Sequence, residues 1–234
     1  MKTVTIIIPA YNEQDNILKL IKRIKYLIPK ACIYIIDDSV GLETSLIINK
    51  NKVSYFHRAK KLGRGSAVIF GLKKAILNKN CKIFIEMDAD FSHCPDELIK
   101  NINFFKKNNL DLLVSSRYLK NSKIINWPVS RRIFSFFANY LAKKILKIPV
   151  SDYTNGFRIY SKRSVHKIIR DCGKIGDGFI ILSEILMKLH ESKYKISETS
   201  SIFRNRSRGE SSVNLKLIFE SFIGLIKLYF CKNK

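Results

Sequence analysis

The chain has 234 residues, 46% of them hydrophobic, which suffices for the core of one large domain. Its 43 Lys and Arg against 19 Asp and Glu give a formal charge of +24, which favours an anionic partner: nucleic acid, lipid headgroups or phosphorylated substrates. No apolar run is long enough to span a bilayer, and the first residues enter a predicted strand directly, so we expect no signal peptide.

The five cysteines are scattered and form no CxxC pair. This pattern argues against a zinc site or a disulfide framework and indicates a reduced, cytosolic setting.

Over the first 115 residues, short apolar runs alternate with amphipathic stretches. The predicted strands are residues 4–8, 32–36, 53–56, 83–87 and 110–115, and the predicted helices are 13–27, 65–77 and one that opens at Pro95. Continuous apolar strands separated by helices are typical of a mostly parallel sheet covered on both faces. The sequence therefore predicts an α/β fold.

The second half contains two predicted basic amphipathic helices, residues 131–147 and 214–230, both rich in Phe. Such a helix can lie in a membrane interface or pack its aromatic side chains inward, and the pattern leaves both possibilities open.

Three polar clusters follow predicted strands: Pro9 to Glu13, Asp37-Asp38, and Asp88-Ala89-Asp90. Ligands of parallel sheets bind at the carboxyl ends of the strands, so these clusters point to one site. Asp88 and Asp90 lie one residue apart and point to the same side of an extended chain. Two carboxylates this close repel each other unless a cation lies between them, which predicts a divalent ion bound with substrate phosphates. His93 is expected to order this loop rather than to bind zinc.

Together with more specific motifs, these residues resemble the inverting glycosyltransferases of family 2, and within them the polyprenol-phosphate (dolichol-phosphate) mannosyltransferases, which have the GT-A fold. The resemblance covers residues 5 to about 226. The motifs that carry it are Ile8–Glu13, Lys61–Ala67 with Gly71, Met87–His93, Ser116–Tyr118, Trp127 with Arg131 and Ser135, Asp152–Arg158, Glu184, and Arg206 with Gly209–Ser211.

The resemblance implies transfer of mannose from GDP-mannose to a polyprenyl (dolichyl) phosphate, with Mg²⁺ or Mn²⁺ as cofactor. The implied residues are, for the nucleotide sugar, Pro9, Tyr11, Glu13, Asp38, Asp88, Ala89, Asp90 and Arg206; for the metal, Asp88, Asp90 and Ser92; for the acceptor phosphate, Arg117, Arg131 and Ser135; and for catalysis, Asp90, Arg117 and Arg131. A phosphate acceptor has a second pKa of about 6 and needs no general base at neutral pH. Arginine suits it because the guanidinium pairs bidentately with phosphate oxygens.

Because a polyprenyl acceptor stays in the bilayer, we expect a cytoplasmic protein peripheral at the cytosolic face of a membrane. The basic helices or a membrane-protein partner would attach it. The resemblance implies a GT-A domain over residues 1–211, with a nucleotide-binding half over 1–115 and an acceptor half over 116–211, followed by a C-terminal amphipathic helix over 212–234.

The chain departs from the family pattern at Ser39, where Gly is usual, at Asn155, where Ser is frequent, and at Ser212, where Lys is expected. The Gly-Gly that commonly precedes the tryptophan is also missing. These departures leave a UDP-sugar donor, such as UDP-glucose, and an inactive relative as alternatives. The charge also allows a nucleic-acid-binding protein. We expect no nucleic-acid partner, because the acidic residues cluster at strand ends and the aromatic residues follow core or amphipathic spacing.

Overall fold

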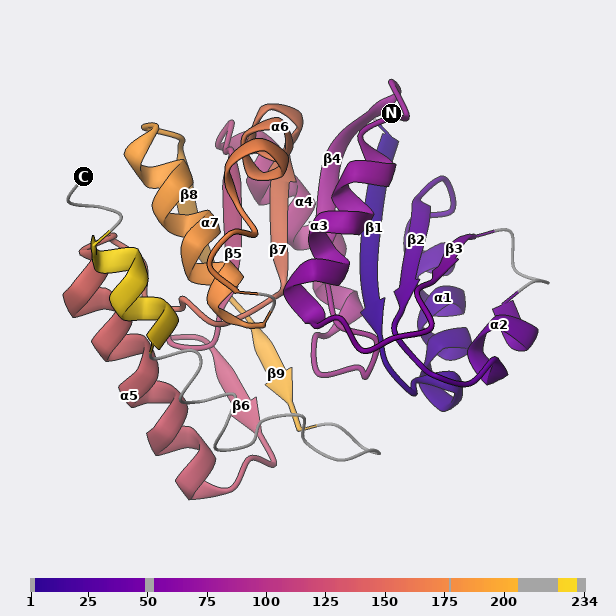
Figure 1. The fold of residues 1–234 in the computed structure, drawn as a ribbon, viewed down its shortest axis with the longest axis horizontal. Helices are drawn as coiled ribbons and strands as arrows, with labels where there is room; N and C mark the ends of the chain where they lie inside the picture. The colour runs from indigo at the N-terminus through magenta and orange to yellow at the C-terminus, as the bar shows by residue number, and fades with distance from the viewer. Residues whose placement is uncertain (1–2, 49–52, 177, 206–222, 231–234) are drawn as a thin grey trace.

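The computed structural model describes residues 3–48, 53–176, 178–205 and 223–230. A seven-stranded sheet has the order β3-β2-β1-β4-β7-β5-β8, and β6 and β9 form a small second sheet (Figure 1). The strands are β1 (Thr3–Ala10), β2 (Cys32–Asp37), β3 (Ser54–His57), β4 (Cys81–Glu86), β5 (Leu112–Ser116), β6 (Lys123–Ile125), β7 (Arg158–Ser161), β8 (Ile196–Ser200) and β9 (Ile202–Arg204). The helices are α1 (Gln14–Leu27), α2 (Glu43–Ile48), α3 (Arg64–Ala75), the 3₁₀ turn η1 (Pro95–Glu97), α4 (Leu98–Lys107), α5 (Val129–Leu146), α6 (Lys162–Asp171) and α7 (Ile180–Glu191).

The predicted α/β fold with a mostly parallel sheet is confirmed. Strands β1 to β4 run parallel, as do β5 and β8, and only β7 runs antiparallel to its two neighbours, β4 and β5. Ala10 pairs with Asp37, and Ile7 pairs with Glu86. The carboxyl ends of β1, β2 and β4 therefore lie at one edge of the sheet, where the three polar clusters were expected to meet.

Helices cover both faces of the sheet (Figure 1). Helices α3, α6 and α7 pack on one face and α1 and α4 on the other, so the sheet separates two hydrophobic cores. Within β1, Ile6 and Ile8 enter one core and Ile7 the other, as alternation along a strand requires. At Gly71, a Cβ would lie 2.5 Å from Cγ2 of Ile7, so this glycine lets α3 approach the sheet closely.

Several elements, most of them in the second half of the fold, were predicted incompletely or not at all. The helix expected at Pro95 opens as η1 before α4, and α5 starts at Val129, directly after Pro128. Helices α2, α6 and α7 and strands β6 to β9 were not predicted. Of the predicted helix 214–230, residues 223–230 are helical and 214–222 lie outside the described residues, as does the proposed domain boundary at 211/212. None of the helices that the structure describes is long and apolar enough to cross a membrane.

Candidate active site

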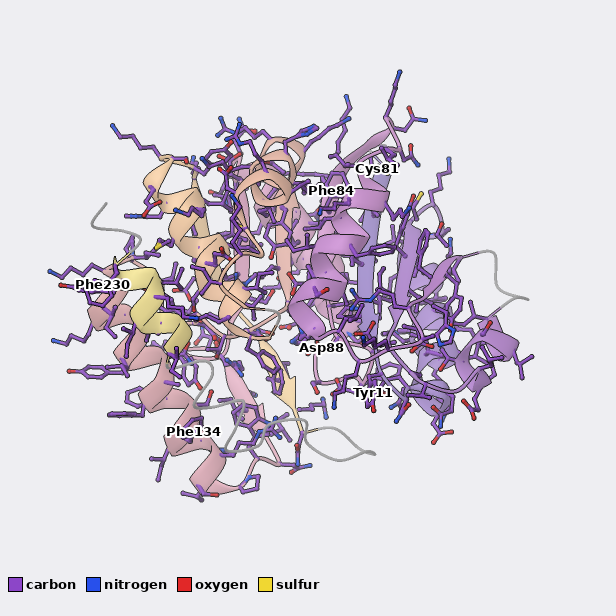
Figure 2. The ribbon with its side chains drawn as sticks, viewed as in Figure 1. Tyr11, Cys81, Phe84, Asp88, Phe134 and Phe230 are labelled. Carbon is purple, nitrogen blue, oxygen red and sulfur yellow. The ribbon has the colours of Figure 1, made fainter. Side chains whose placement is uncertain are left out.

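The first part of the site is an acidic edge, formed where β1, β2 and β4 end. Figure 2 shows Tyr11 and Asp88 at this same edge. Pro9 lies within β1, and Tyr11 follows the strand with its ring 4.5 Å from Nζ of Lys61. Glu13 precedes α1 and accepts a hydrogen bond from Nδ2 of Asn16 at 2.8 Å. Ala10 at the end of β1 pairs with Asp37 at the end of β2, so Tyr11 and Glu13, predicted to bind the nucleotide, follow β1 at the edge of the sheet where β2 also ends.

Ser39 joins the ends of β1 and β2. Its hydroxyl donates to Oδ1 of Asp37 at 2.5 Å and accepts from the backbone N–H of Asn12 at 2.8 Å. Asn12 has a positive φ of 56°, a conformation that Asn tolerates. Burial and the Asp37 carboxylate raise the pKa of Tyr55, which stays protonated and donates to Oδ2 of Asp37 at 2.7 Å. The departure from Gly at position 39 therefore has a structural role.

Asp38 is engaged by Arg58, a residue that the sequence analysis missed. Nε and Nη2 of Arg58 donate to the two carboxylate oxygens at 2.6 and 2.7 Å, and the backbone N–H of Leu62 donates to Oδ2 at 3.0 Å. Both side chains of the ion pair are buried. A nucleotide that binds Asp38 would do so beside a fixed guanidinium.

The turn after β4 carries the two carboxylates predicted to bind metal. The backbone N–H of Asp88 donates to Nδ1 of His93 at 3.0 Å, and Oδ1 of Asp90 accepts from the backbone N–H of Ser92 at 2.9 Å. Phe91 between them has φ +61°, which is strained for a bulky residue and is held by these two bonds. Asp90, Ser92 and Ala89 are buried, whereas 26% of the Asp88 side chain is exposed.

Arg64 is the second charged residue that the sequence analysis missed. Its Nη1 lies 2.5 Å from Oε1 of Glu86, and its Nε and Nη2 lie 2.9 and 2.7 Å from Oδ1 of Asp88. Burial alone would lower the pKa of Arg64, but the charges of Asp88 and Glu86 raise it, so the guanidinium stays charged. The hydroxyl of Tyr160 donates to Oε2 of Glu86 at 2.7 Å. One sequence signal was available: Glu86 is a charged residue that directly follows the apolar run Ile83–Ile85 at the end of β4.

The second part of the site is an arginine–aromatic cluster, formed by Arg117 with Trp127 and Arg131. Arg117 is buried and follows β5; its Nε and Nη2 each lie 2.8 Å from an oxygen of Asp152. Burial alone would lower the pKa of Arg117, but Asp152 raises it. Nη1 of Arg117 makes no hydrogen bond within the part of the chain that the structure describes.

Arg117 and Arg131 both lie against the ring of Trp127, with guanidinium carbons 5.5 and 4.3 Å from its centroid. Arg131 also donates to Oδ1 of Asn205 at 3.1 Å. One turn further along α5, Oγ of Ser135 accepts from the hydroxyl of Tyr118 at 2.6 Å. The three residues predicted for the acceptor phosphate thus lie on the end of β5 and the first turns of α5.

The loop before β7 holds both parts of the site. Asp152 fixes Arg117. Nδ1 of His93 accepts from the backbone N–H of Asp88, and Nε2 lies 2.8 Å from Oδ1 of Asn155, so His93 is the Nε2–H tautomer and orders the turn after β4. At Gly156, a Cβ would lie 1.9 Å from Nη2 of Arg64. The contact with His93 is made by Asn155, the second position at which the chain departs from the family pattern. Arg158, fully buried, donates to three backbone carbonyls: those of Tyr153, Asn155 and Leu182.

Aromatic contacts connect the acidic edge to the arginine–aromatic cluster. The ring of Phe203 in β9 lies 5.4 Å from that of His93 and 5.2 Å from that of Trp127, both in edge-to-face arrangements. The guanidinium carbon of Arg117 lies 5.3 Å from the same ring. The acidic edge and the arginine cluster are therefore neighbouring parts of one site. Arg206, Gly209–Ser211 and Ser212 lie outside the described residues.

The oxygen atoms of Asp88, Asp90 and Ser92 are the kind of ligand that Mg²⁺ and Mn²⁺ accept. In the described ranges, no three His, Cys, Asp or Glu side chains are grouped so as to hold a metal ion. Ions of this kind are commonly held by one or two carboxylates, with phosphate oxygens of a substrate completing the shell. The donor set fits such an ion.

A family model described as "Glycosyl transferase family 2" matches residues 5–169. The chain is 27% identical over 216 residues to a polyprenol monophosphomannose synthase of Mycolicibacterium smegmatis, an alignment that covers 89% of this chain and 80% of that protein. It is 36% identical over 226 residues to a dolichol-phosphate mannosyltransferase of Pyrococcus furiosus, covering 93% of this chain but only 61% of the length of that relative.

Among solved structures, the chain resembles glucosyl-3-phosphoglycerate synthase from Mycobacterium tuberculosis in complex with Mn²⁺, uridine diphosphate and glucosyl-3-phosphoglycerate. The TM-score is 0.67 at 15% identity, over 97% of this chain and 80% of that one. At this identity the likeness concerns the fold, which is of the expected GT-A type.

Proposed function

The chain belongs to glycosyl transferase family 2 and is a glycosyltransferase, and from this premise we propose that it transfers mannose from GDP-mannose to a polyprenyl (dolichyl) phosphate, with inversion at the sugar carbon. The names of the Mycolicibacterium and Pyrococcus relatives support mannose and a polyprenol acceptor. The observation that carries the proposal is the position of Phe203, which contacts His93 of the acidic edge and also Arg117 and Trp127 of the arginine–aromatic cluster. Arg131 lies against the same Trp127 ring.

In this proposal, Asp88, Asp90 and Ser92 hold Mg²⁺ or Mn²⁺. When bound, the ion neutralises the charge that develops on the departing nucleoside diphosphate. The Mn²⁺ and uridine diphosphate in the related solved structure support a divalent ion in this fold. Glu86 is not assigned as a ligand, because its two oxygens are already bonded to Arg64 and Tyr160.

The nucleotide sugar lies along the ends of β1, β2 and β4 in this proposal. The residues assigned to it are Pro9, Tyr11, Glu13, Asp38, Asp88, Ala89, Asp90 and Arg206. Carboxylates such as Glu13 and Asp38 can accept hydrogen bonds from ribose hydroxyls or guanine nitrogens. The Arg58–Asp38 pair keeps the second carboxylate in a fixed orientation for that contact.

The acceptor phosphate is assigned to Arg117, Arg131 and Ser135. A phosphate monoester is already largely dianionic at neutral pH, so the enzyme must orient it and offset its charge rather than remove a proton. The charged Arg117 fits this task. Asp152 cannot serve as a base while both its oxygens are bonded to Arg117. Two fixed arginines opposite a cation-binding edge would hold two anionic substrates against their mutual repulsion.

We further propose that α5 attaches the enzyme peripherally to the cytosolic face of a membrane, directly or beside a membrane-protein partner. Large apolar side chains on α5 are exposed next to basic ones, as in interfacial helices. The exposed apolar residues are Val129, Ile133, Phe134, Phe136, Phe137 and Tyr140. Of these, Phe134 is labelled in Figure 2. We expect the enzyme to sediment with anionic vesicles and to be released by salt; equal sedimentation with neutral vesicles would contradict a charge-dependent attachment.

The test of the reaction is a panel of GDP-mannose, UDP-glucose and other labelled sugar nucleotides, each with a polyprenyl phosphate and Mg²⁺ or Mn²⁺. We expect labelled lipid from GDP-mannose, and its loss in Asp88→Asn and Asp90→Asn. Asp96→Asn, in the η1 turn that follows this loop and on an exposed carboxylate, is the matched control and should retain activity. Labelled lipid from UDP-glucose alone would overturn the donor assignment, and full activity of both site variants would overturn the site.

A further inference from the structure

The position of Arg64 is unfavourable for a cation within its own helix. Arg64 is the first residue of α3, where the positive end of the helix dipole disfavours positive charge. Gly63 before it has φ +93°, and the first turn of α3 contains no acidic residue. The charge is instead offset by two carboxylates from the end of β4, so α3 directs a cation at the acidic edge.

The guanidinium contacts one of the two carboxylate oxygens of Asp88, a residue assigned to the metal. Two of its nitrogens, Nε and Nη2, contact Oδ1 of Asp88, and the third, Nη1, contacts Glu86. The other oxygen of Asp88 lies 3.8 Å from Nε2 of His93. Glu86 is fully buried and also bonded to Tyr160, which anchors Arg64 beside the turn. A divalent ion that approaches Asp88 therefore meets a positive charge already in contact with it.

We propose that Arg64 is a resident counter-ion, a positioning residue that makes binding of the divalent ion depend on the nucleoside diphosphate. This inference rests on the proposed sugar-nucleotide chemistry and deepens it. Without a diphosphate, Arg64 neutralises Asp88 and lowers the affinity of the acidic edge for the ion. A bound diphosphate offers phosphate oxygens both to the guanidinium and to the ion, so that ion and diphosphate strengthen each other's binding.

The test measures Mn²⁺ binding to the full chain by the electron paramagnetic resonance signal of free Mn²⁺, alone and with GDP or UDP. For the wild type we expect either nucleotide to tighten Mn²⁺ binding by at least about fivefold. In Arg64→Met, Mn²⁺ alone should bind at least about tenfold tighter, because a unit positive charge bonded to an assigned ligand of the ion is removed. The enhancement by nucleotide should shrink in the same variant.

Arg163→Met is the matched control, because it removes the same formal charge from an exposed arginine paired with Asp111, outside the acidic edge. It should bind Mn²⁺ as the wild type does. If Arg64→Met does not fold, Arg64→Met with Glu86→Gln removes one charge of each sign and leaves an acceptor for Tyr160. Tighter binding of Mn²⁺ by this double variant than by the wild type supports the proposal.

Unchanged or weaker Mn²⁺ binding in the folded Arg64 variants overturns the inference. So does a wild type whose Mn²⁺ affinity is the same with and without nucleotide. Both readouts are independent of mannose transfer. If the wild type makes mannosyl lipid but Arg64→Met binds Mn²⁺ with wild-type affinity, the inference is refuted and the proposed function stands. If the wild type makes no mannosyl lipid but Arg64→Met binds Mn²⁺ more tightly, the proposed function is refuted and the inference stands.

Discussion

Gly156→Ala tests how tightly Arg64 is held between Glu86 and Asp88. The three heavy atoms nearest to an added Cβ all belong to the Arg64 guanidinium, at 1.9, 2.5 and 3.0 Å. The end of an arginine normally moves aside at little cost. Here the guanidinium is bonded to two carboxylates, one of them fully buried, and moving it would break those ion pairs.

The expected cost follows from what is left behind. Loss of one partner from a buried ion pair costs about 3–5 kcal/mol, because the other charge stays buried and uncompensated. Tyr160 still donates to Glu86, so we expect the lower end, about 3 kcal/mol. In an Arg64→Met background the same Gly156→Ala change meets no guanidinium, and we expect it to alter stability by no more than about 1 kcal/mol.

The assay is urea unfolding of four proteins: wild type, Gly156→Ala, Arg64→Met and the double variant. The predicted coupling between the two positions is about 2 kcal/mol or more. Effects that add to within about 0.5 kcal/mol would show that Gly156 and Arg64 are independent, and would refute the reasoning that Gly156 makes room for the guanidinium.

Two further predictions concern stability. Ser39→Ala removes hydrogen bonds to Asp37 and Asn12, and we expect it to lower the free energy of unfolding in urea by about 1–3 kcal/mol. The control Ser130→Ala, on the exposed side of α5, should lower it by less than about 0.5 kcal/mol. Equal effects of the two changes would contradict the role of Ser39. Burial alone would raise the pKa of Asp152, but Arg117 lowers it below the ordinary value, so its contribution to stability is present above a pH of about 4 and is lost as the pH falls toward the folded-state pKa. Asp152→Asn should therefore be less stable at neutral pH and show a flatter decline below pH 4 in a pH series of unfolding curves; a decline as steep as that of the wild type would refute this assignment.

The first half of the fold could be predicted because its signals are local. Strands β1, β2 and β4 each contain a run of apolar residues, and each polar cluster lies at or directly after the end of its strand. The second half depends on contacts that no local pattern reveals. Strand β7 has only four residues, including the buried Arg158, and it enters the sheet antiparallel between β4 and β5, both of which lie far from it in sequence. Helix α7 is buried almost all round, so it lacks the amphipathic spacing that reveals a helix.

The same distinction applies to the site. The acidic clusters were visible because carboxylates at strand ends share an edge in a parallel sheet. The partners of those carboxylates could not be predicted. Arg58 lies in a loop 20 residues from Asp38, and Arg64 lies at the start of α3, 24 residues from Asp88. Motif residues such as Asp152, Asn155 and Gly156 indicated the family, but the motif did not indicate which residues they contact. Their roles follow only from the structure.

In the proposed reaction, those roles connect three residues of one loop to both substrates. Asp152 fixes an arginine assigned to the acceptor, Asn155 fixes the histidine of the metal turn, and Gly156 leaves room for the arginine that touches Asp88. A shift of this loop would move all three contacts together. The loop before β7 therefore links the acidic edge to the arginine–aromatic cluster. The proposed reaction brings two anions into line, and such a link would keep the turn after β4 in register with the two arginines assigned to the acceptor phosphate.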